Sequence, residues 1–169
     1  MKKLILITLS IITLSSCDKV TQTLAIKHND AIIAESDKVV GVFDAVSNSL
    51  TSFNADTITI ALQKYNLQIN QSLQNINKAL ALKDSSLKLT TIEMIKTFKS
   101  VGENEFSKIR DIYTIPDSLY TTTEEKEVTA LATAIDEKIE TAQNKQRNAQ
   151  IAFAKKYNFV LMMGKDTLK

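Results

Sequence analysis

Apolar residues recur at steps of three and four along most of this chain, which is the spacing of a helix with one buried face. The rhythm is clearest from Asp56 to Leu82, where Gln and Asn side chains fill the positions between. The apolar positions there are Ile58, Leu62, Tyr65, Ile69, Leu73, Ile76 and Leu80. Three further stretches have similar spacing. The pattern predicts four long helices, at residues 20–50, 56–82, 86–113 and 122–158.

Glycine and proline are scarce, with 3 Gly and 1 Pro in 169 residues. An all-β domain would need many more of both for its turns. Gly102 predicts a kink or local break in the third helix, and Pro116 prevents that helix from continuing. The predicted connections are short, which favours antiparallel neighbours. We therefore expect an all-α fold, an up-down-up-down antiparallel four-helix bundle.

The start of the fourth helix carries a sequence signature of its own. Thr122 is followed three residues later by Glu125, the spacing of a capping box. In that motif the hydroxyl accepts a hydrogen bond from a free backbone amide, and the carboxylate reaches back to the capping residue. We expect Thr122 and Glu125 to cap this helix.

The N-terminus has the three parts of a secretory signal: Met1–Lys3 is cationic, Leu4–Leu14 is almost wholly apolar, and small residues follow. The apolar stretch is shorter than the ~20 residues that a membrane-spanning helix needs. Leu14–Cys17 resembles the bacterial lipobox, in which the cysteine thiol forms a thioether to diacylglycerol. We expect residues 1–16 to be a cleaved signal peptide and 17–169 to be one helical domain lipidated on Cys17. The alternative is a free cysteine near an ordinary signal cleavage site.

Processing changes the charge of the chain. The whole sequence has 21 basic and 19 acidic residues, and loss of Lys2 and Lys3 with the signal leaves 19 of each. A mature domain without net charge argues against a nucleic-acid partner. It also means that membrane attachment must come from acyl chains such as palmitate, of which two or more hold stably. The lone cysteine excludes a disulfide within the monomer.

Known catalytic and metal-binding patterns do not fit the sequence. A ferritin-like site needs paired Glu-x-x-His motifs, whereas His28 is the only histidine and no Glu lies three residues before it. No Cys-x-x-Cys-His haem motif and no Gly-flanked serine elbow occur. We expect no enzyme activity, metal or cofactor, and we expect solvated or packing roles for Glu93, Glu137, Glu140, Met162 and Met163.

Three features favour interactions with a partner, and each of them also has a simpler structural explanation. The stretch Asp111–Glu127 is the longest predicted loop, and loops often carry binding sites, although a plain helix connection also explains it. The Gln- and Asn-rich face of the second helix could pack on a partner or simply be solvated. Basic residues near the end of the last helix suit the helix dipole without forming a patch, namely Lys145, Arg147, Lys155 and Lys156.

The lipobox and a composition rich in Lys, Ile, Asn and Thr resemble small surface or periplasmic lipoproteins of Bacteroidota or spirochaetes. The closing stretch from Ala142 to Phe159 is similar to the C-terminus of an uncharacterised family of bacterial surface lipoproteins. This resemblance implies a surface location and no particular activity. Asp18 resembles either an inner-membrane retention signal or a signal for the outer surface. We favour the outer membrane, on its periplasmic face or at the cell surface, over the inner membrane.

These observations predict a lipid-anchored cell-envelope protein with a binding or structural role and an envelope protein as its partner. An alternative is a carrier or sensor that holds a small molecule or lipid in the bundle interior. A hydrolytic or metal-dependent enzyme is the third hypothesis. A sizeable apolar cavity would favour the second hypothesis, and a bound metal would favour the third.

Overall fold

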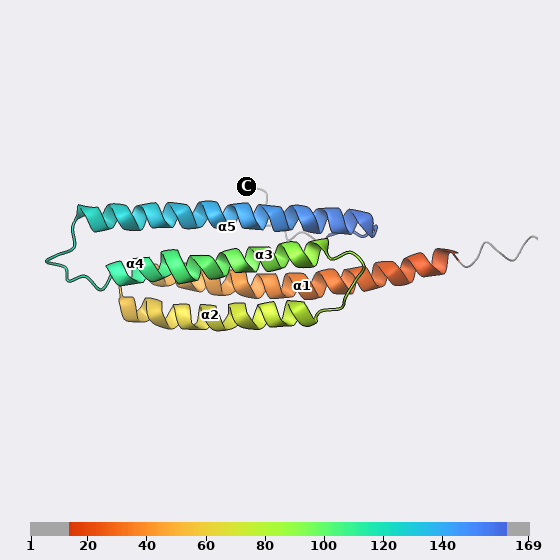
Figure 1. Cartoon of the computed structure of the whole chain (residues 1–169), viewed down its shortest axis with the longest axis horizontal. Helices are drawn as coiled ribbons and strands as arrows, with labels where there is room; N and C mark the ends of the chain where they lie inside the picture. The colour runs from red at the N-terminus through yellow and green to blue at the C-terminus, as the bar shows by residue number, and fades with distance from the viewer. Residues whose placement is uncertain (1–13, 162–169) are drawn as a thin grey trace, which may run out of the picture.

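The computed structural model describes residues 14–161, and their side chains from residue 21 onward. Its helices are α1 (Leu14–Leu50), α2 (Ala55–Lys78), α3 (Ser86–Val101), α4 (Ser107–Ile112) and α5 (Thr122–Lys156). A π-helical turn, η1 (Gly102–Phe106), joins α3 to α4, so the three run on as one rod (Figure 1). The predicted antiparallel four-helix bundle is confirmed. Residues 1–13, which hold most of the predicted signal peptide, lie outside the described residues.

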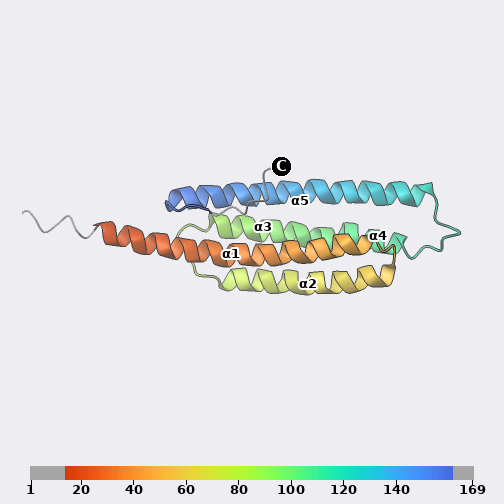
Figure 2. The same ribbon diagram turned by 180° about the vertical axis from the view of Figure 1, so that it is seen from behind.

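The four rods lie side by side along one long axis. α2 and α5 lie on opposite sides of the α1–α3 pair (Figures 1 and 2). α1 is the longest helix, with 37 residues against 24 in α2, and its N-terminal end projects beyond the other rods. Among the described helices, none combines the length and apolar character needed to cross a bilayer.

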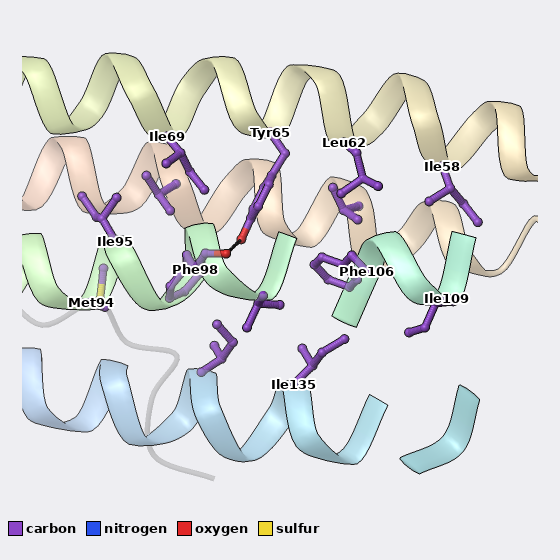
Figure 3. Packing of buried hydrophobic residues seen from close by; sticks show 14 of the residues in the cluster. Ile58, Leu62, Tyr65, Ile69, Met94, Ile95, Phe98, Phe106, Ile109 and Ile135 are labelled. Atoms are coloured by element: carbon purple, nitrogen blue, oxygen red, sulfur yellow. Dashed lines mark hydrogen bonds between the residues drawn. The ribbon is translucent and has the colours of Figure 1, made fainter. Parts of the chain in front are cut away.

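The core forms because each helix contributes its apolar stripe to the space between the rods (Figure 3). Tyr65, Phe98 and Phe106 lie at its centre and are almost fully buried. The main cluster extends along the bundle from Val46 and Ile58 to Ile69 and Met94. A second, smaller cluster occupies the end from which α1 projects, and it consists of Ala25, Ile32, Leu87 and Phe153.

Gly102 marks the π-helical turn, so the predicted local irregularity is present, but the helix continues through it. A Cβ atom at Gly102 would meet the Tyr65 ring at 2.5 Å, which explains why a glycine stands here. Tyr65 Oη donates a hydrogen bond to the Phe98 carbonyl (2.6 Å). Ser107 Oγ donates to the Gly102 carbonyl (2.8 Å). Side-chain donors therefore serve one backbone carbonyl just before the widened turn and one at its first residue.

The predicted cap of the last helix was wrong by one residue. Thr121, not Thr122, is the capping residue, and its hydroxyl accepts from the Thr123 amide (3.1 Å). The Glu124 carboxylate, rather than that of Glu125, accepts from the Thr121 amide (2.8 Å). The sequence from Thr121 to Glu125 contains the capping-box spacing twice, as Thr121 with Glu124 and as Thr122 with Glu125. The extended backbone of Thr121 selects the earlier one.

The second helix also ends earlier than predicted, at Lys78 rather than residue 82. Ala79 leaves the helical conformation with ψ at 151°. The Leu80 carbonyl then accepts a hydrogen bond from His28 of α1, and the Leu80 side chain is half exposed. Leu80 therefore continues the three- and four-residue spacing of apolar positions in the sequence, but it lies outside the helix and does not extend its buried face. α1, in turn, begins at Leu14 rather than residue 20, since no glycine or proline interrupts the chain there.

Candidate functional site

Cys17 lies in the first turn of α1, on the part of that helix that projects beyond the bundle (Figure 1). Its side chain is not among those described. The first buried side chain of α1 in the described part is Ala25, and the nearby Gln22 donates a hydrogen bond to the Asn158 carbonyl after α5. Eight helical residues from Cys17 to Ala25 span about 12 Å. The backbone at Cys17 is thus held away from the packed core.

His28 is buried against the second core cluster, with its ring centroid 5.6 Å from that of Phe153. Its Nδ1 lies 2.8 Å from the Leu80 carbonyl, which identifies Nδ1 as the protonated nitrogen because a carbonyl can only accept. Burial lowers the pKa of His28, and the Leu80 carbonyl opposes this effect only in part. The histidine is therefore neutral at pH 7 and fastens the α2–α3 connection to α1.

Glu35 is a buried carboxylate on α1 that joins this helix to α2. It accepts hydrogen bonds from Lys38 (2.6 Å), Ser72 (2.9 Å) and Asn75 (3.2 Å). Gln68 supports the arrangement by donating to the Ser72 hydroxyl (3.0 Å). Burial alone would raise the pKa of Glu35, but the three donors outweigh it and lower the pKa. Because both oxygens of this ionised carboxylate already accept hydrogen bonds, Glu35 joins two helices and does not act as a general base.

A second buried carboxylate, Glu105, belongs to the π-helical turn. Its Oε1 accepts from Lys138 of α5 at 2.5 Å. Its Oε2 is buried and has no hydrogen-bond partner among the described residues. The pair links the widened turn to α5, because the turn presents Glu105 toward that helix.

A groove of about 490 Å³ runs along the surface between α3 and α5. Met94 and Ala142 give it an apolar floor, while Glu93 and Lys145 form an ion pair (2.7 Å) at its edge. The Lys145 ammonium lowers the pKa of the Glu93 carboxyl through this hydrogen bond. The groove has the volume of a small-molecule site, but it lies on the outside of the bundle.

Few of the residues that the sequence suggested as candidate ligands or contact residues lie close together in the structure. Glu137 and Glu140 are exposed, as expected for a solvated face. Met162, Met163 and the end of the chain lie outside the described residues. The connection before α5 spans residues 113–121, and Tyr113 at its start contacts the ring of Phe53, 5.3 Å between centroids.

The buried carboxylates were missed, although the sequence held a signal for one of them. Along α1 the buried apolar positions Ile32 and Val39 are seven residues apart, and Glu35 and Ser36 occupy the buried positions between them. A carboxylate and a hydroxyl within an apolar stripe indicate an internal polar contact. The partners on α2 could not be identified from that signal, because they lie 37 to 40 residues away.

No group of three or more His, Cys, Asp or Glu side chains converges as a metal site in the part of the chain that is described. Comparisons with protein families, curated proteins and solved structures found no match. The candidate features are therefore the projecting Cys17, two buried carboxylate contacts and one surface groove.

Proposed function

We propose that this chain is a lipid-anchored protein of the bacterial cell envelope, attached through Cys17 and serving a binding or structural role. The observation that carries the proposal is the Leu14–Cys17 motif after an apolar stretch, with the cysteine on a helix end that projects from the bundle. A lipid attached at that position reaches a membrane without disturbing the core.

The internal contacts support a binding or structural role over a catalytic one. Glu35 accepts three hydrogen bonds, and His28 holds a backbone carbonyl. Titratable groups that work in catalysis need an open path to a substrate. Both of these groups instead hold α1 to other parts of the bundle: Glu35 joins it to α2, and His28 joins it to the α2–α3 connection. The partner that we propose is another envelope protein, on the outer membrane or at the cell surface.

The anchor is tested by changing Cys17→Ala in cells and following the protein through membrane fractionation. We expect the variant to leave the membrane fraction and to keep its unprocessed N-terminus, because no thioether can form. Ser15→Ala is the matched control, since alanine is also small, and it should remain processed and membrane-bound. A Cys17→Ala protein that stays in membranes with the same mature N-terminus would overturn the proposal.

A second candidate function is that of a carrier or sensor for a small molecule or lipid, held in the surface groove between α3 and α5 rather than in the bundle interior that the sequence suggested. Its volume of about 490 Å³ suits a ligand of modest size. Native mass spectrometry of protein purified from membranes tests this function. A carrier would show a bound mass that disappears in Thr141→Trp, where an indole fills the groove. Protein without a bound mass in either form would exclude the carrier.

A further inference from the structure

Charge is segregated along the bundle, although the mature chain as a whole is balanced. Contacts at one level of the axis, Ser36–Met94, Glu35–Ser72 and Glu93–Lys145, divide the bundle into two halves. The anchor half, on the side of Cys17, comprises residues 21–36, 72–94 and 145–161. It has 8 basic and 4 acidic side chains, a net charge of +4. The far half, residues 37–71 and 95–144, has 8 basic and 13 acidic side chains, a net charge of −5.

Three segments that are distant in sequence meet at the end of the anchor half. His28 of α1 holds the Leu80 carbonyl, and Lys156 of α5 pairs with Asp84 (2.7 Å). These contacts gather lysines from α1, the end of α2, the α2–α3 connection and α5. Several of them are exposed and have no ion pair within the described residues, namely Lys27, Lys78, Lys83 and Lys155.

The same end exposes apolar side chains beside the lysines. Val160 is 89% exposed and Leu80 is 50% exposed. Leu24 and Ile26 of α1 are each more than one-third exposed. Apolar side chains next to unpaired lysines are the composition of a surface that lies against the headgroup region of a membrane.

We propose that this basic, apolar-edged end of the bundle is a second membrane contact, which binds anionic lipid headgroups and holds the rod upright. The inference rests on the proposed anchor, because a lipid on Cys17 brings this end to the membrane. The helix from Cys17 to Ala25 rises about 12 Å. The headgroup layer occupies roughly half of that height. The remaining distance between the headgroups and the lysines is within about one Debye length, so their attraction is not fully screened. The acidic far half then points away from the anionic surface.

The test uses residues 17–169 with Cys17→Ser, so that no lipid contributes. The first buried side chain of the described part is Ala25, and a hydrogen bond from Gln22 precedes it, so this segment keeps the whole packed core. Vesicles of phosphatidylcholine with about 30% phosphatidylglycerol are compared with phosphatidylcholine alone. We expect binding to the anionic vesicles only, and its loss at about 0.5 M salt because the attraction is screened.

Two matched pairs of variants locate the contact. Lys83→Glu with Lys155→Glu should weaken vesicle binding by more than about tenfold, whereas Lys64→Glu with Lys126→Glu changes net charge equally at the far half and should have little effect. Leu80→Ser with Val160→Ser should also weaken binding. Its control is Ile60→Ser with Leu67→Ser, which removes two apolar side chains of α2 that are also at least half exposed.

The outcomes separate this inference from the anchor itself. If the anionic vesicles do not bind the folded segment, or if the far-half lysine pair weakens binding as much as the anchor-half pair, the second contact is disproved. Either result leaves the Cys17→Ala fractionation untouched, because that experiment depends on lipidation alone. Circular dichroism of each variant checks that the helices remain.

Discussion

Gly102 and Gly41 are both helical, yet their surroundings differ at the level of single atoms. A Cβ at Gly102 would lie 2.5 Å from the Tyr65 ring, which is itself fully buried and cannot retreat. A Cβ at Gly41 would meet nothing within 4 Å. The first glycine is required by packing, while the second only adds conformational freedom to the unfolded chain.

The two glycines therefore predict opposite effects of one substitution. Gly102→Ala should lower the free energy of unfolding by about 1–3 kcal/mol, because the core must shift to admit a methyl group. Gly41→Ala should raise it by about 0.5–1 kcal/mol, because alanine is the better helix former. Urea unfolding followed by circular dichroism measures both. Equal effects at the two positions would contradict the close approach of Tyr65 to the π-helical turn.

Asp84 gives the fold a dependence on pH. Hydrogen bonds from Lys156 and from Ser86 lower its pKa to about 2. A carboxylate whose folded pKa is lowered stabilises the fold above its unfolded pKa, and this stabilisation is lost as the pH falls toward about 2.

Asp84→Asn should therefore cost about 1 kcal/mol at pH 7, after allowance for solvent screening of its exposed lysine partner. The difference from the unmodified protein should shrink as the pH falls below about 4 and should be small near pH 2. Asp117→Asn, in the exposed connection before α5, is the control and should leave stability unchanged. Thermal unfolding across this pH range is the measurement. A constant difference at every pH would show that the Asp84 carboxylate does not act through its charge.

At the scale of helices, the ends are set by side chains that satisfy free backbone groups. Asn54 begins α2 by accepting from the Thr57 amide (2.9 Å), and Thr121 begins α5. The end of α2 is set from outside, by the hydrogen bond between His28 and Leu80. An end that depends on another helix cannot be located from local sequence.

The register of the α5 cap can be tested directly. Thr121→Ala should destabilise the protein by about 1 kcal/mol, since it removes the acceptor for the Thr123 amide. Thr122→Ala should have little effect, because Thr122 lies inside the helix rather than at its cap. Chemical denaturation of the two variants distinguishes the registers. A larger loss from Thr122→Ala would restore the register that the sequence alone suggested.

The helices themselves were predictable because apolar periodicity is a local property. Ile58, Leu62 and Tyr65 are buried as their spacing required. The contacts that connect helices were not predictable. Glu35 needs donors from α2, and the π-helical turn forms where the Tyr65 ring occupies the space beside Gly102. Both depend on residues brought together only by the packing of separate helices.

The whole molecule is a rod with the proposed anchor and a basic region at one end and an acidic region at the other. The near-zero net charge of the mature chain gave no sign of this arrangement, because a residue count does not say where along the bundle axis each charge lies. Lys155 and Lys156 at the end of α5 have a helix-dipole explanation when α5 is considered alone. Their proximity to the α2–α3 connection, seen in the Lys156–Asp84 pair, is what makes them part of a larger surface.

We propose that Cys17 carries the lipid that fixes this rod to a membrane. Intact mass spectrometry of the protein purified from membranes tests this proposal. Lipidation at Cys17 predicts the mass of residues 17–169 with a diacylglyceryl group, and further acylation of the amino terminus adds to that mass. Fragmentation should assign the added mass to the residue at position 17. A membrane-purified protein with an unmodified thiol at Cys17 would show that the anchor lies elsewhere.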